Sequence, residues 1–146
     1  MNDRDRIIDE AFKPAVSARA EDYCYTLAHD FEWAGAPDAG GVFVFCDERG
    51  REWLRIVRGT IFVRAGYSWD GCSSAPDGAT DPATGKPITY YASCVHDALY
   101  QFIKNRDFPY TRAQCDGIFY RLLREARFPF ARLYWLGVRL FGWTHV

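Results

Sequence analysis

The sequence of 146 residues lacks several features that would assign it to a class at once. No run approaches the roughly 18 apolar residues of a transmembrane helix. The N-terminal stretch MNDRDRIIDEAF is charged where a signal peptide has its apolar core. Basic charge is not in excess, since the formal net charge is −1 and the pI is about 6.3. We therefore expect no transmembrane segment, no signal peptide and no nucleic-acid partner.

Cysteine is present, but its spacing suits neither a disulfide framework nor a zinc site. The five cysteines are an odd number and form no Cys-x-x-Cys pair. Reduced thiols in a cytosolic compartment are the simpler interpretation, with Cys94 and Cys115 as small buried side chains of a helix pair. By contrast, aromatic residues are abundant at 17%, so rings can line a pocket or an interface as well as a core.

The first half of the chain has the apolar and β-branched runs of an antiparallel sheet. These runs lie at residues 41–46, 52–57 and 60–64. The first two flank a four-residue link that ends in Gly50, and Arg58-Gly59 separates the last two, which predicts successive hairpins. We expect a β-meander over residues 22–64, preceded by a short helix at residues 3–12.

A loop and then helices follow the predicted strands. Residues 66–87 are rich in Gly, Pro, Asp, Ser and Thr, which is typical of a loop, and loops this long are usually functional or mobile. Helical patterns then lie at residues 90–104, 112–126 and 130–141, and Thr111 is placed to cap the second. Strands followed by helices predict an α+β fold, and the length fits a single domain over residues 1–146.

A group of side chains that could carry chemistry begins in the string YASCVHDALYQF. His96 and Tyr100 are four residues apart on one helical face, and Asp97 lies about 100° around the helix from His96. If the first two predicted helices run antiparallel, Asp116 lies at the height of His96. Asp116 could then accept a hydrogen bond from one imidazole nitrogen and leave the other as a general base, while Tyr100 donates its hydroxyl to Asp116.

Each of these features also has a structural interpretation. His96 can be hydrogen-bonded between a helix and the sheet, Tyr100 can be a core residue, and Asp116 can pair with an arginine of its own helix. The arginines near the C-terminus have the spacing of a solvated helix face; they are Arg121, Arg124, Arg127, Arg132 and Arg139. The segment FPFARLYWLGVRLFGW is expected to contain a core helix, with an interface to a membrane or another protein as the alternative.

Five residues of the two helices resemble a known enzyme signature. They are His96, Asp97, Tyr100, Cys115 and Asp116. Together they resemble secretory phospholipases of the A-two type, in which a helix with His-Asp-x-x-Tyr precedes a helix with Cys-Asp. The resemblance implies that His96 activates water, Asp116 orients the imidazole, and Asp97 holds a calcium ion that stabilises the oxyanion of an ester substrate such as a phospholipid. The resemblance covers two helices only. It departs from the family pattern in two ways: Leu99 replaces a half-cystine, and the Tyr-Gly-x-x-Gly calcium loop is not recognisable.

A second resemblance covers more of the chain. Its blocks are Gly-Tyr-x-x-Asp-Gly-x-Ser at 66–73, Ser-x-x-His-Asp-x-Leu-Tyr at 93–100, Ala-x-x-Asp-x-x-Phe at 113–119 and Val-Arg-x-Phe-Gly at 138–142. Their order resembles an uncharacterised family of small proteins that is frequent in tailed phages and prophages. It implies a protein of the bacterial cytoplasm or of a virion, without an established activity.

The second resemblance adds two loop residues to the candidate site. Asp70 with His96, Asp97 and Asp116 would make a cluster of imidazole and carboxylates able to hold calcium or another divalent metal. Ser73 could instead act as a nucleophile, but no Gly-x-Ser-x-Gly elbow is present. Three functions therefore stay open. They are an ester hydrolase that uses His96 and Asp116, an accessory or virion protein with a structural His-Asp cluster, and a module that binds a host factor.

Overall fold

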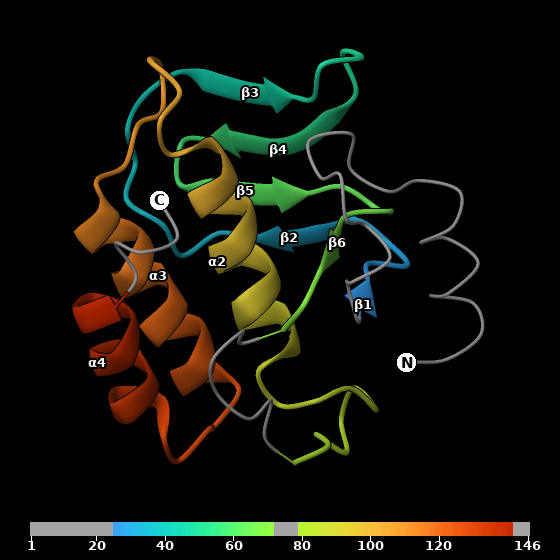
Figure 1. Cartoon of the computed structure of the whole chain (residues 1–146), viewed down its shortest axis with the longest axis vertical. Helices are drawn as coiled ribbons and strands as arrows, with labels where there is room; N and C mark the ends of the chain where they lie inside the picture. The colour runs from blue at the N-terminus through green and yellow to red at the C-terminus, as the bar shows by residue number, and fades with distance from the viewer. Residues whose placement is uncertain (1–24, 72–78, 142–146) are drawn as a thin grey trace. The chain divides into compact units, whose positions relative to one another are not determined.

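The computed structural model describes residues 25–71 and 79–141 (Figure 1). Two compact units meet in the chain between Asp70 and Gly71. The strand unit contains the β-strands and the helix unit contains the helices, which confirms the predicted α+β class. The helix expected at residues 3–12 lies outside the described residues.

The strand unit is built on a four-stranded antiparallel sheet with the order β2-β5-β4-β3. Its strands are β2 (Phe31–Trp33), β3 (Val42–Cys46), β4 (Glu52–Val57) and β5 (Thr60–Val63). The predicted meander is confirmed as β3-β4-β5, and β2 pairs with the free side of β5. Alternation along β5 buries Ile61 and Val63 completely and leaves Thr60 and Phe62 half-buried, as expected for a sheet with one covered face.

Both predicted hairpin turns are present. Arg58 and Gly59 join β4 to β5 with positive φ angles of 47° and 85°, the geometry of a two-residue turn that matches strand twist. In the link between β3 and β4, Asp47 accepts the backbone N–H groups of Arg49 and Arg51 at 2.8 and 3.0 Å. The side chain of Asp47 therefore holds the longer turn closed.

A second, two-stranded sheet corrects the prediction that residues 66–87 are all loop. β6 (Ser68–Trp69) pairs antiparallel with β1 (Tyr25–Thr26). The hydroxyls of Ser68 and Thr26 lie 2.9 Å apart in a buried position, and Trp69 is fully buried. The composition of residues 66–87 predicts a loop and not this strand. The strand forms because it pairs with residues that lie 42 positions away along the chain.

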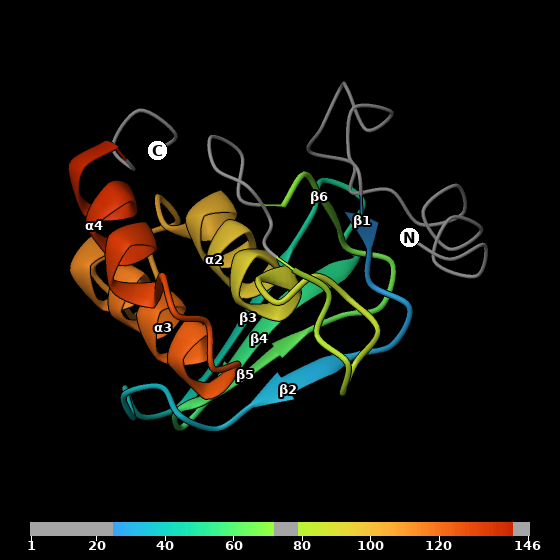
Figure 2. The same ribbon diagram turned by 90° about the horizontal axis from the view of Figure 1, so that it is seen from below.

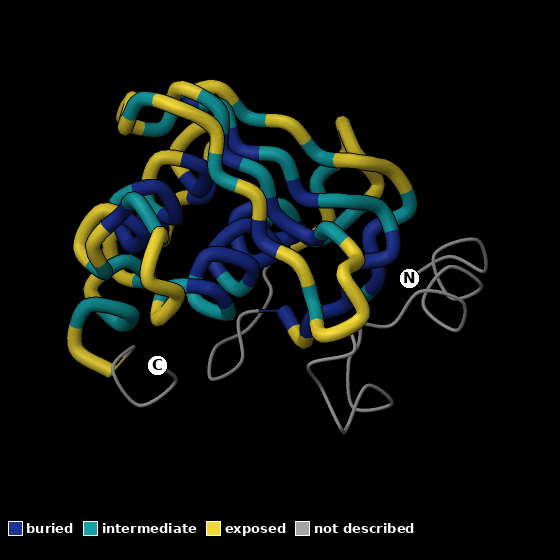
Figure 3. Tube along the Cα trace, turned by 90° about the horizontal axis from the view of Figure 1, so that it is seen from above, coloured by how far each residue is buried: buried dark blue, intermediate teal, exposed yellow. Residues whose placement is uncertain are grey.

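The helix unit contains α2 (Tyr90–Phe102), α3 (Arg112–Glu125) and α4 (Ala131–Phe141), which confirms the three predicted helices (Figure 2). Thr111 caps α3 as predicted: its hydroxyl accepts the backbone N–H of Gln114, whose side chain accepts the N–H of Thr111. α3 packs against both α2 and α4. Buried residues line α2 and α3, whereas most of α4 is exposed or half-buried (Figure 3).

α4 also corrects a prediction, because it is not a core helix. Ala131 is its single buried residue, and several of its large apolar side chains are exposed. Among the described residues, no helix combines the length and apolar character that crossing a bilayer requires.

Candidate functional site

Asp116 on α3 is the centre of the candidate site. Its side chain is fully buried, and its Oδ1 atom lies 2.8 Å from Nε2 of His96 and 2.5 Å from the hydroxyl of Tyr100. Its Oδ2 atom accepts a hydrogen bond of 2.8 Å from Nη1 of Arg139, and Nε of Arg112 lies 3.7 Å from the same oxygen. We call these five residues the Asp116 cluster.

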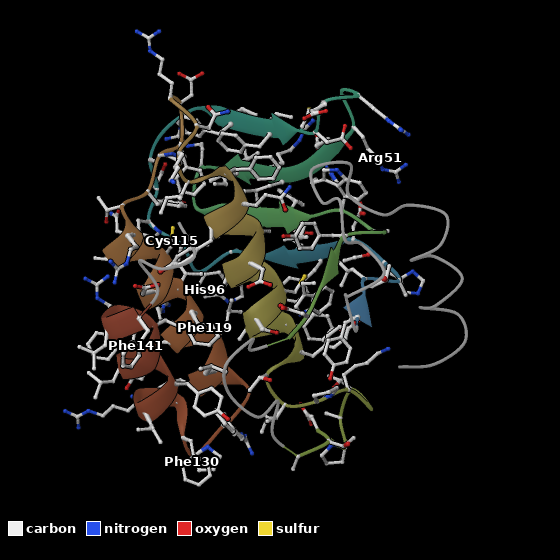
Figure 4. The ribbon with its side chains drawn as sticks, in the orientation of Figure 1. Arg51, His96, Cys115, Phe119, Phe130 and Phe141 are labelled. Atoms are coloured by element: carbon white, nitrogen blue, oxygen red, sulfur yellow. The ribbon has the colours of Figure 1, made fainter. Side chains whose placement is uncertain are left out.

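Helix geometry brings the members of the cluster together. His96 and Tyr100 are one turn apart on α2, with ring centroids 4.1 Å apart, so both reach the same carboxylate oxygen. The imidazole also packs against Phe119 of α3 at 4.7 Å between ring centroids, and Figure 4 labels both residues. Packing against the rings of Tyr100 and Phe119 restricts the orientation of the imidazole that meets Asp116.

The two arginines of the cluster come from α4 and from the first turn of α3. Arg139 reaches Asp116 from α4. Arg112 extends from the first turn of α3 and donates at 2.5 Å to the backbone carbonyl of Arg139. Asp116 therefore connects all three helices: its Oδ1 atom bonds α2 and its Oδ2 atom bonds α4.

The charge state of the cluster follows from its contacts. Burial by itself would raise the pKa of Asp116, but hydrogen bonds from His96 and Tyr100, the electrostatic interaction with His96 and the hydrogen bond from Arg139 together lower it. Burial and the bond to Asp116 raise the pKa of Tyr100, so its phenol stays protonated and donates. Because an ionised carboxylate can only accept, Nε2 of His96 is the donor in the contact with Asp116.

The structure confirms the two contacts predicted for Asp116, with His96 and with Tyr100. It also bears out the alternative that Asp116 pairs with an arginine of its own helix, since Arg112 precedes it by one turn. The sequence does not identify Arg139 as a member of the cluster, because its spacing is that of a solvated helix face. The spacing of Arg112 and Asp116 could have indicated their pairing, but nothing local indicates Arg139, which lies 23 residues from Asp116.

The two residues predicted to hold a metal, Asp97 and Asp70, belong to different units of the chain. Asp97 is half-buried on α2, whereas Asp70 is exposed in the strand unit, and Ser73 lies outside the described residues. Across residues 25–71 and 79–141, no group of three or more His, Cys, Asp or Glu side chains could hold a metal ion. Calcium binding at Asp97 and Asp70 therefore stays a prediction.

Two cysteines flank the site without serving it as nucleophiles. Cys94 and Cys115 are both buried and carry free thiols, as expected from the sequence. Burial raises the pKa of Cys94 well above its usual range and that of Cys115 to about 12. Both thiols are therefore protonated and unreactive at neutral pH.

The fold and the site define an α+β protein in which a buried carboxylate holds a histidine, a tyrosine and two arginines. By sequence, the chain belongs to the family described as Protein of unknown function (DUF1353), whose family model matches residues 52–138. That match contains the sequence blocks around Asp70, His96 and Asp116. No curated protein and no solved structure matches the chain significantly.

Proposed function

We propose that His96 and Asp116 form the general-base pair of a hydrolase that acts on esters, with phospholipids as the first substrate class to test. The observation that carries the proposal is the 2.8 Å contact between Nε2 of His96 and Oδ1 of a fully buried carboxylate. Donation from Nε2 selects the tautomer in which Nδ1 is the basic nitrogen. The local resemblance of the two helices to secretory phospholipases gives the pair its substrate class.

The proposed reaction needs no covalent intermediate. Nδ1 of His96 removes a proton from water as the water oxygen attacks the ester carbonyl carbon, and Asp116 stabilises the imidazolium that forms. The tetrahedral intermediate then expels the alkoxide, which takes the proton from Nδ1, so the products are a carboxylic acid and an alcohol. Tyr100 holds Asp116 in position, and Asp116 stays ionised throughout.

Replacing His96 by glutamine tests the proposal. The assay follows hydrolysis of a short-chain nitrophenyl ester and of phosphatidylcholine in mixed micelles. The expected result is a rate about 100- to 10,000-fold lower, the contribution of a general base, in a variant that circular dichroism shows to be folded. Its unfolding midpoint should fall modestly, because the buried hydrogen bond to Asp116 is altered. His29→Gln is the matched control, since His29 is exposed and belongs to the strand unit. Equal rates for the wild type and His96→Gln would refute the assignment.

Calcium at Asp97 is a separate proposal that rests on the phospholipase resemblance. Calorimetric titration of the protein with calcium tests it directly. A binding heat that disappears in Asp97→Asn supports the site, and the absence of any heat in the wild type rejects it. The result does not affect the test of the proposed reaction with His96→Gln, because no step of that reaction involves a metal.

A structural function is the second candidate, favoured by the way in which Asp116 links α2, α3 and α4. In this case the protein is an accessory phage protein of the bacterial cytoplasm or a protein of the virion, and the Asp116 cluster stabilises its fold. Any host factor then binds at another surface. This function predicts that the wild type hydrolyses neither substrate, while His96→Gln changes stability alone. Ester hydrolysis that depends on His96 would exclude it.

A further inference from the structure

α4 and the residue before it expose a row of large apolar side chains. Their exposed fractions lie between 45% and 65% for Phe130, Leu133, Leu136, Leu140 and Phe141. We call these five residues the α4 face, and Figure 4 labels Phe130 and Phe141 near its two ends. Single exposed apolar residues are ordinary, but five within twelve positions form an exposed apolar patch, and such patches often mark an interaction surface.

The orientation of α4 is fixed by contacts on its other side. At about 100° per residue, the five apolar positions occupy one continuous arc of the helix. Ala131 is buried outside this arc, Trp135 packs against Tyr120 of α3 with ring centroids 6.0 Å apart, and Arg139 bonds Asp116. The contacts with α3 therefore leave the apolar arc turned away from that helix.

The charge in the sequence around the α4 face is predominantly positive. Between residues 121 and 141 the chain has five arginines and a single acidic residue, Glu125. Arg132 is exposed on α4 itself, and Arg121, Arg124 and Arg127 are exposed at and just after the end of α3. A second copy of the same face would bring arginines against arginines, whereas an anionic surface complements them.

We propose that the α4 face docks on an anionic lipid bilayer, with the helix lying in the plane of the interface. An amphipathic helix with Leu and Phe on one face and arginine at its border is the form that such surfaces bind. The apolar side chains would enter the boundary between headgroups and acyl chains, and Arg132 would remain among the lipid phosphates. This binding is independent of the proposed hydrolysis and does not involve His96.

Co-sedimentation with vesicles tests the proposal. The full chain is mixed with vesicles of phosphatidylcholine alone or of phosphatidylcholine with phosphatidylglycerol, at low and at raised salt. We expect binding to the anionic vesicles that weakens with salt, because screening reduces attraction between exposed charges. The double variant L133S/L136S should lower the partition coefficient by about tenfold or more, since buried leucine area is lost without a change of charge. Arg132→Gln should lower it by about fivefold.

Matched controls make the result specific to the α4 face. The double variant V42S/V44S removes two exposed apolar side chains from β3, and His96→Gln removes the proposed base; both should bind like the wild type. The proposal is overturned if the wild type does not bind, if it binds neutral vesicles as well as anionic ones, or if L133S/L136S binds unchanged. A wild-type dimer that L133S/L136S dissociates would overturn it too, since a second copy would then cover the face. Should L133S/L136S fail to fold, Arg132→Gln and the salt series decide the question.

Discussion

Nε2 of His96 lies 2.8 Å from Oδ1 of Asp116, although the two residues are 20 positions apart and on different helices. The carboxylate has two consequences for the molecule. Toward α2 it orients an imidazole, as a general base requires, and toward α4 it forms an ion pair with the guanidinium of Arg139. Any substitution in the cluster therefore has to be measured for stability as well as for activity.

Asp116→Asn should destabilise the protein while keeping its shape. The amide retains the size of the side chain but loses the charge that Arg139 and His96 face, and its NH₂ group must donate where the carboxylate accepted. A loss of about 1–3 kcal/mol in the free energy of unfolding is expected for a buried group left badly paired. Urea denaturation measures it, with Asp107→Asn at an exposed position as the control. A change no larger than that of the control would contradict the central role of Asp116.

Stability should fall in acid partly through Asp116. Its pKa in the folded state is below the ordinary value of 3.8, so its stabilising contribution is complete above that value and is lost as the pH falls through the lower, folded-state pKa. Glu52 acts in the same direction in the strand unit, because hydrogen bonds from Arg55 and Arg64 lower its pKa despite burial. Urea midpoints measured from neutral pH into acid should therefore decline less steeply in Asp116→Asn than in the wild type. An identical decline would show that Asp116 contributes nothing to it.

The sequence indicated those elements whose signals are local. Arg58-Gly59, the Asp47 link and Thr111 each determine a turn or a helix start within a few residues, and all three are found as predicted. The contacts of Asp116 with His96 and Tyr100 were also predictable, because helical spacing and an antiparallel helix pair suffice to place them.

Features that depend on distant partners were not predictable. β6 has loop-like composition and becomes a strand only because Tyr25–Thr26 pairs with it. The bond from Arg139 to Asp116 depends on how α4 packs against α3, which the spacing of arginines does not reveal. For the same reason, the amphipathic pattern of α4 predicts a core helix although the helix is largely exposed: periodicity identifies an apolar face but not what covers it.

Gly59→Ala should cost more than the same change at Gly50, although both glycines have positive φ, +85° and +82°. A Cβ at Gly59 would lie 2.6 Å from the carbonyl oxygen of Ala36, whose N–H bonds the Gly59 carbonyl, whereas a Cβ at Gly50 meets nothing within 4 Å. The expected losses are about 1 kcal/mol for Gly50→Ala from backbone strain alone and about 2 kcal/mol or more for Gly59→Ala. Thermal and urea unfolding of the two variants measure the difference. Equal losses would mean that the approach of Ala36 to the turn is not a real constraint.

Tyr100→Phe separates the positioning of Asp116 from the packing of His96. The substitution removes the hydroxyl that donates to Oδ1 at 2.5 Å but keeps the ring that packs on the imidazole at 4.1 Å. Stability should fall by about 1 kcal/mol, the net value of one hydrogen bond. If His96 is the base, kcat for ester hydrolysis should fall about tenfold with KM unchanged, because a positioning residue acts on the transition state and not on substrate binding. Tyr120→Phe is the matched control, since its hydroxyl accepts from Arg124 outside the cluster. A stability loss in Tyr100→Phe with no change in kcat would assign Tyr100 to the framework of the helix unit alone.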